Sequence, residues 1–255
     1  MGIDLNFSNS VAVMTINRPD ALNALNLAQI TAIEAAVDRV SNSDARALVV
    51  LGAGGKAFCA GADIKELAAG TLLTHRRDLE AGQRAFSRLH GLPIPSIAAI
   101  DGYAFGGGLE LALACTFRLA GRRAKLGLPE IKLGLIPGYG GTQRLARLIG
   151  ESRALELILS GRTVNAEEAL QWGMVNRLLE TATLESALEY AAGFTAFSRM
   201  ASRFALDAVQ RGAAVDVERG LYIERDQATL AFQTEDAAEG MAAFMEKRTP
   251  AFKDR

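Results

Sequence analysis

The sequence has few of the residues on which several classes of protein depend. Cysteine and histidine each occur only twice in 255 residues, and no C-x-x-C pair is present. Two cysteines, Cys59 and Cys115, cannot form the disulfide framework of a chain this long, and no metal-binding spacing occurs. We therefore expect neither a metal ion nor structural disulfides, and a reducing compartment, with the cytoplasm as the location.

The chain also has no large excess of charge of one sign and no long apolar run. Lys and Arg number 28 and Asp and Glu 29, so the strongly basic footprint of a dedicated nucleic-acid binder is missing. We interpret a local basic cluster, Arg118, Arg122, Arg123 and Lys125, as a solvated surface. No run reaches the ~18 apolar residues of a membrane span, and the polar residues 1–10 do not resemble a signal peptide. We expect neither nucleic acid nor membrane as a partner.

Hydrophobic residues are plentiful, at 49% of the chain, which is enough to bury a sizeable core. Short apolar runs predict buried strands at residues 11–16, 47–51 and 96–100. Helical spacing of apolar residues predicts helices at residues 27–40 and 107–115. Strands and helices thus alternate to about residue 150, which predicts an α/β fold.

Beyond residue 150 the patterns are mostly helical, interrupted by a short strand at residues 175–179. We divide the chain into a core of residues 1–195 and a C-terminal helical module of residues 196–255. The module has apolar positions for which no core remains: Leu221, Ile223, Leu230 and Phe232. This excess predicts a homo-oligomer.

Glycine clusters occur at residues 52–55, 106–108 and 138–141. The first matches a dinucleotide fingerprint, G-x-G-x-x-A, but no amphipathic helix follows it, and Ala57 stands where a P-loop needs Ser or Thr. The second lies between a predicted strand and a predicted helix. The free N–H groups of a helix start suit a developing oxyanion. Close packing of the backbone alone could also demand these three glycines.

Two glutamates lie in apolar, glycine-flanked segments. Glu110 has Leu109, Leu111 and Ala112 around it, and Glu130 follows Pro129 ahead of a glycine-rich loop. A carboxylate is costly to bury unless it is paired or used. With only two histidines available, the pair predicts carboxylate acid–base chemistry.

Several longer motifs resemble those of the crotonase superfamily, the enoyl-CoA hydratases and isomerases. They are residues 56–66 (KAFCAGADIKE), 102–112 (GYAFGGGLELA) and 128–145 (LPEIKLGLIPGYGGTQRL), with residues 17–19, 23–25 and 244–248 in support. The resemblance is strongest to the hydratases and runs through the whole chain in order. It implies an α/β fold of the ClpP/crotonase type: a β-β-α superhelix of two nearly perpendicular sheets, with a C-terminal helical module. It also implies a trimer or a dimer of trimers.

The resemblance implies a role for each matching residue. The N–H groups of Ala62 and Gly107 would form an oxyanion hole, and the N–H of Gly138 would hold the catalytic water. Glu110 would help to deprotonate this water, and Glu130 would deliver a proton to the α-carbon. The CoA thioester would be bound by residues of two segments and the C-terminal helices: Ala21, Leu22, Ala60, Asp63, Ile64, Lys65, Phe244 and Lys247. Lys247 would act either within its own subunit or across a subunit boundary. CoA would be part of the substrate, and no separate cofactor is expected.

Both glutamates together favour a hydro-lyase that converts a trans-2-enoyl-CoA into a 3-hydroxyacyl-CoA. An isomerase that shifts the double bond of a 3-enoyl-CoA is the alternative, since it needs one carboxylate and no attacking water. An RNA-binding member of the fold and an inactive structural one are weaker alternatives. Thr116 departs from the Asp of many relatives, and we interpret it as a structural substitution.

Overall fold

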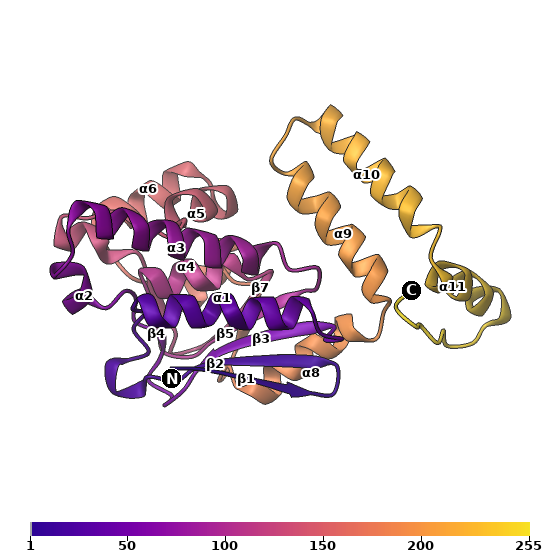
Figure 1. Ribbon diagram of the computed structural model, residues 1–255, viewed down its shortest axis with the longest axis horizontal. Helices are drawn as coiled ribbons and strands as arrows, with labels where there is room; N and C mark the ends of the chain where they lie inside the picture. The colour runs from indigo at the N-terminus through magenta and orange to yellow at the C-terminus, as the bar shows by residue number, and fades with distance from the viewer. Residues whose placement is uncertain (1) are drawn as a thin grey trace.

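The core is wound from successive units of two strands and a helical segment (Figure 1). The structure is a computed structural model that describes residues 2–255; Met1, the first residue of the polar N-terminal stretch, lies outside them. In each unit the first strand joins a six-stranded sheet and the second joins a four-stranded sheet. The units are β3 (Ala47–Gly52) with β4 (Ala57–Cys59), β5 (Ser96–Ile100) with β6 (Tyr103–Phe105), and β7 (Phe117–Gly121) with β8 (Lys125–Gly127).

The central strands of the six-stranded sheet are buried on both faces, which explains their nearly continuous apolar sequences. Its order is β1-β2-β3-β5-β7-β10, with β1 (Ile3–Ser8), β2 (Val11–Ile16) and β10 (Arg177–Leu179); β1 is antiparallel to β2 and the other pairs are parallel. Successive side chains point to opposite faces. Met14 and Val50 face a core shared with α1 (Leu27–Ser41), whereas Val13 and Val49 face a second core covered by α8 (Leu184–Thr195).

The predicted strands and helices of the core are confirmed, but the interpretation of the basic cluster as a solvated surface is wrong for Arg118. This side chain lies in β7 and is buried. Its guanidinium donates to the carbonyl oxygens of Met174 at 2.8 Å and Cys115 at 2.7 Å. Cys115 ends the helix α4 (Gly107–Ala114), so the cation interacts favourably with the last carbonyls of that helix. Arg122 and Arg123 are exposed, as expected.

Thr116 connects the starts of β5 and β7. Its hydroxyl accepts from the backbone N–H of Ser96 at 3.1 Å, and the Ser96 hydroxyl accepts from the N–H of Thr116 at 3.0 Å. This reciprocal pair supports the structural interpretation of Thr116.

Replacing Thr116 by Val should lower the free energy of unfolding by about 1–3 kcal/mol, because it removes the acceptor of a buried N–H group. Urea denaturation would measure the loss. Thr116→Ser keeps the hydroxyl and is the matched control. A Val variant as stable as the wild type would contradict the prediction.

The four-stranded sheet sets the place of the site. Its order is β4-β6-β8-β9, where β9 is Val164–Asn165, and β4, β6 and β8 are parallel neighbours. The carboxyl ends of parallel strands meet at one edge of a sheet, where ligands bind in α/β folds. The three segments that leave this edge contain Ala62, Gly107 and Glu130.

The remaining helical segments cover the sheets or follow the core. They are η1 (Pro19–Ala21), α2 (Ile64–Ala68), α3 (Leu72–His90), η2 (Pro129–Leu133), α5 (Gly141–Ile149), α6 (Glu151–Ser160), α7 (Ala166–Gln171), α9 (Arg199–Gly212), α10 (Val217–Ala231) and α11 (Glu235–Glu246). Within residues 2–255, no helix combines the length and the apolar character needed to cross a membrane.

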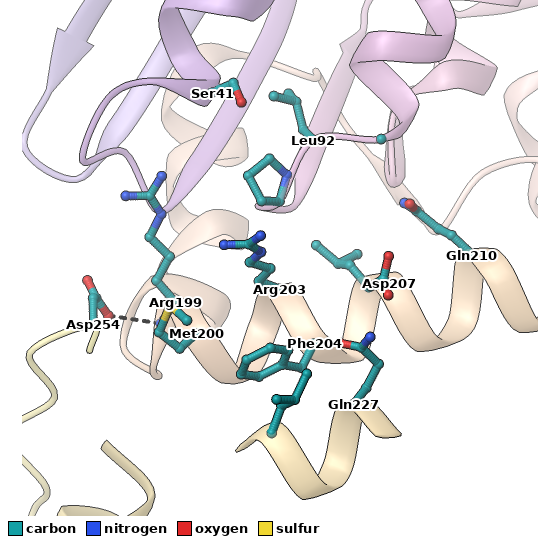
Figure 2. Close-up of a pocket in the computed structure, with 14 residues that line it drawn as sticks. Ser41, Leu92, Arg199, Met200, Arg203, Phe204, Asp207, Gln210, Gln227 and Asp254 are labelled. Carbon is teal, nitrogen blue, oxygen red and sulfur yellow. Dashed lines mark hydrogen bonds between the residues drawn. The ribbon is translucent and has the colours of Figure 1, made fainter. Parts of the chain in front are cut away.

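Helices α9, α10 and α11 extend away from the core at the right of Figure 1. No residue of α9 or α10 is buried, and the side chains of Leu221, Leu230 and Phe232 are 58%, 50% and 69% exposed. A cavity of about 650 Å³ separates α9 from the ends of α1 and α3 (Figure 2). Asp254 joins the two parts: it accepts from the N–H of Arg199 at 2.9 Å and pairs with Arg46 at 2.8 Å.

Candidate active site

Two backbone N–H groups lie together at the edge of the four-stranded sheet. A β-carbon added to Gly107 would lie 3.6 Å from the nitrogen of Ala62, so the two residues are neighbours. Gly107 begins α4, where the first N–H groups of a helix have no partner within the helix. Among residues 2–255, neither N–H donates a hydrogen bond. The pair is therefore available to a carbonyl oxygen.

The glycines of this turn serve two different purposes. A β-carbon on Gly108 would lie 2.1 Å from the carbonyl oxygen of Cys59, so close packing of α4 on β4 demands glycine there. Gly106 has a φ of +50°, which L side chains rarely adopt. Gly107 faces Tyr139 instead: a β-carbon added to Gly107 would lie 3.1 Å from the ring of Tyr139. The close-packing interpretation of the cluster is thus confirmed at Gly108.

Glu110 is buried, as expected, with 2% of its surface exposed. Its Oε1 accepts from the N–H groups of Tyr139 at 2.8 Å and Gly141 at 2.7 Å. Burial, together with the charge of Glu130, raises the pKa of Glu110 to about 7 against the opposing effect of these two hydrogen bonds. The carboxyl is thus poised to exchange a proton near neutral pH.

Glu130 stands across the same space, on η2. Its Oε1 would be 3.0 Å from a β-carbon on Gly106, and its Oε2 is buried with no hydrogen-bond partner among the described residues. Burial raises the pKa of Glu130. An unpartnered buried carboxyl oxygen is unusual in a folded protein and indicates a functional position.

The loop of residues 138–141 completes the site. Gly138 is half-buried; its carbonyl oxygen accepts from the side chain of Gln83 at 2.9 Å, and its N–H has no acceptor in the part of the chain that is described. An added β-carbon would lie 2.4 Å from a methyl group of Leu79. The loop is thus packed against α3, and its free N–H is available for a small polar ligand.

The residues predicted to bind CoA fall into two groups. Ala21, Leu22 and Ala60 lie side by side, since the N–H of Ala60 donates to the carbonyl oxygen of Leu22 at 3.0 Å. Asp63 caps α2 through the N–H of Lys65 and pairs with Arg18 at 3.2 Å. Ile64 and Lys65 are exposed beside it.

Phe244 and Lys247 form the other group, at the end of α11. Within one chain the structure does not bring them to the site: α11 and α2 lie at opposite ends of the molecule in Figure 1. Phe244 is 86% exposed.

Two residues of the site were not singled out from the sequence, although both lie in its motifs. Tyr139 is buried between Gly82 and Gly107, with its ring edge-on to Phe86 at 5.5 Å. Arg144 donates to the carbonyl oxygen of Tyr139 at 2.9 Å. An aromatic or a cation in a glycine-rich turn is too common a pattern to have distinguished them.

Comparison with known proteins places the chain in a family. The profile of a family described as enoyl-CoA hydratase/isomerase matches residues 6–255. The chain belongs to this family. A short-chain-enoyl-CoA hydratase of Clostridium acetobutylicum is 40% identical over 248 residues, which cover 96% of this chain and 95% of that protein. A crotonyl-CoA hydratase of Syntrophomonas wolfei is 40% identical over 252 residues, covering 98% and 97%.

Solved structures give the same result. A crystal structure of an enoyl-CoA hydratase from Bacillus anthracis is 40% identical and covers 100% of both chains, with a TM-score of 0.96. One from Geobacillus kaustophilus is 39% identical with a TM-score of 0.94, covering 100% of this chain and 99% of the other. The predicted crotonase fold, with its C-terminal helical part, is confirmed.

No group of three or more His, Cys, Asp or Glu side chains that could hold a metal ion occurs in residues 2–255. The thiols of Cys59 and Cys115 are unpaired and buried, and burial raises the pKa of each to about 12. Neither thiol is therefore activated as a nucleophile.

Proposed function

We propose that Glu110 and Glu130 act together on one water molecule. The observation that carries this proposal is the pair of carboxyls with raised pKa at one edge of the sheet, one held by two N–H groups and the other with an unpartnered oxygen. Two such groups interact, so their apparent pKa values belong to the pair.

The reaction is that of the hydratases in the family: the chain is a hydro-lyase that adds water reversibly to a trans-2-enoyl-CoA, giving a 3-hydroxyacyl-CoA. In our proposal Glu110 accepts a proton as the water oxygen bonds to the β-carbon. The electron pair of the double bond moves to the thioester oxygen. Glu130, the proton donor in this proposal, then delivers a proton to the α-carbon.

The N–H groups of Ala62 and Gly107 would hold the thioester oxygen while it carries the enolate charge. They are fixed by the backbone before the reaction starts, so little reorganisation opposes the charge development. The N–H of Gly138 would orient the water. The reaction exchanges only water and a proton, so we propose that no cofactor is needed beyond the CoA of the substrate.

Incubating the wild type with crotonyl-CoA in oxygen-18 water tests the function. Loss of the enoyl-thioester absorbance should accompany labelled oxygen in the product. The isomerase alternative gains no further support from the relatives. Double-bond shift of a 3-enoyl-CoA without labelled product would nevertheless favour it.

We also propose that Lys65, beside the segment of Ala60 and Asp63, contacts the CoA phosphates. Replacing it by Ala should raise KM for the thioester roughly tenfold with kcat nearly unchanged, because a charge-assisted contact is lost from substrate and transition state alike. Lys125→Ala is the matched control, since Lys125 begins β8 at the opposite end of the sheet. Wild-type KM for Lys65→Ala at moderate salt would contradict the assignment. Lys247 should behave like Lys65 only if it reaches the site of a neighbouring subunit.

A contact between Lys247 and the site of a neighbouring subunit requires an oligomer, which we propose to be a trimer or a dimer of trimers. The exposed side chains of Leu221, Leu230 and Phe232 would lie in its interfaces. Sedimentation velocity at micromolar protein should show a species much larger than the 27.1 kDa chain. A single 27.1 kDa boundary would contradict the proposal.

We also propose that the chain divides at residue 195 into a core and a helical module, and that the protein is located in the cytoplasm.

A further inference from the structure

Arg144 folds back from the first turns of α5 onto the loop that precedes it. Its NH1 group donates to the carbonyl oxygen of Tyr139 at 2.9 Å, and its NH2 group donates to the hydroxyl of Ser87 on α3 at 3.3 Å. A β-carbon on Gly140 would lie 2.2 Å from the same NH1 group, and Gly140 has a φ of +111°. The NH1 end of the guanidinium therefore lies against the loop, where glycine leaves room for it.

Tyr139 is hydrogen-bonded both to Arg144 and to Glu110. The N–H of Tyr139 donates to Glu110 Oε1, and its carbonyl group accepts from Arg144. The N–H of Gly141, two residues on, donates to the same carboxyl oxygen at 2.7 Å. The loop is thus clamped between a carboxylate on one side and a guanidinium on the other, and a change in the guanidinium would move both donors.

The charges around Glu110 come from few groups. Glu130 faces it from η2 and raises its pKa, whereas Arg144 from α5 lowers it. The phenol of Tyr139 and the thiol of Cys59 are also near; burial raises the pKa of each to about 12, so both stay neutral. On the far side of Arg144, burial lowers the pKa of His90 at the end of α3. At neutral pH, Arg144 is therefore the main cation among these groups.

We propose that Arg144 is a positioning residue for the reaction, fixing the Tyr139–Gly141 donors on Glu110 and keeping that carboxylate ionised so that it can accept the proton of the water. The inference rests on the role proposed above for Glu110. It concerns a residue that does not touch the reacting atoms.

Three variants test it in the intact protein with crotonyl-CoA. Arg144→Gln should lower kcat by about 10²-fold, the cost of a misplaced catalytic group, with KM nearly unchanged. Because the cation that favours the ionised form of Glu110 is gone, the acid limb of the kcat–pH profile should move to higher pH. Arg144→Lys keeps the charge but not the planar fork, so kcat should fall while the acid limb stays. Arg147 is exposed on α5, and among residues 2–255 its side chain hydrogen-bonds only to Gln143, so Arg147→Gln should match the wild type.

A wild-type kcat and an unmoved acid limb in Arg144→Gln would overturn the inference. If that variant does not fold, Arg144→Lys decides, and a wild-type kcat there would overturn it equally. Failure of the proposed function has a different signature: Glu110→Gln would then retain hydration. If Glu110→Gln loses hydration while Arg144→Gln keeps wild-type activity, only the role proposed for Arg144 is contradicted.

Discussion

Replacing Glu110 or Glu130 by Gln is expected to lower kcat for hydration by about 10²–10⁴-fold, the usual contribution of a general acid or base. Glutamine keeps the shape of the side chain and removes its proton exchange. The double variant should lose far less than the product of the two single losses, because groups that act on the same water are not additive. Loss of the enoyl-thioester absorbance, with matched substrate-binding measurements, checks all three variants.

Folding stability supplies the control for these variants. Burial raises the pKa of Glu110 from 4.5 to about 7 in the folded protein. A carboxyl with a raised folded pKa costs the folded state free energy as the pH rises from its unfolded pKa through its folded pKa. Glu110→Gln avoids this cost, so at pH 8 it should unfold at no lower temperature than the wild type. A stable Gln variant with near wild-type hydration would rule out the two-glutamate mechanism.

Removing the Gly107 donor is expected to have the second largest effect. Gly107 begins α4, a position where helices tolerate proline. Gly107→Pro has no N–H, and its ring occupies the place where the thioester oxygen would bind. Loss of one oxyanion donor typically costs about 10²–10³-fold in kcat, and the ring should raise the loss toward the upper value.

Gly107→Ala is the matched variant, because it keeps the N–H. Its β-carbon would lie 3.1 Å from the ring of Tyr139, a tight contact that a small shift of the ring relieves. Alanine should therefore retain most of the activity, and circular dichroism should show both variants folded. Equal activity of a folded proline variant and the wild type would exclude Gly107 from the oxyanion hole.

The sequence predicted those parts of the fold in which burial dictates the residue type. Strands β2, β3 and β5 are apolar on both faces because two cores cover them. The first strand, β1, was missed: its side chains are largely exposed at the edge of the sheet, so it lacks an apolar pattern. Helix α3 was missed for a related reason, since it buries only a narrow stripe around Ala85, Phe86 and Leu89.

The site likewise has residues that the sequence predicts and residues that it does not. Glu110 could be found because a carboxylate among leucines and alanines has no structural explanation, and its burial is confirmed. Its position near Glu130 depends on the parallel alignment of β6 and β8, which links segments 20 residues apart and has no local pattern. Arg144 could not be found, since its contact with Tyr139 exists only once the loop has folded around Gly140.

The exposed apolar side chains of α10 have a consequence for handling the protein. Leu221 and Leu230 leave half or more of their surface in contact with water in the single chain. Whatever free energy their burial in an assembly contributes is set by mass action, and so it falls as the protein is diluted. The melting temperature should then depend on protein concentration, and activity at assay dilution should decay with the time since dilution from a concentrated stock.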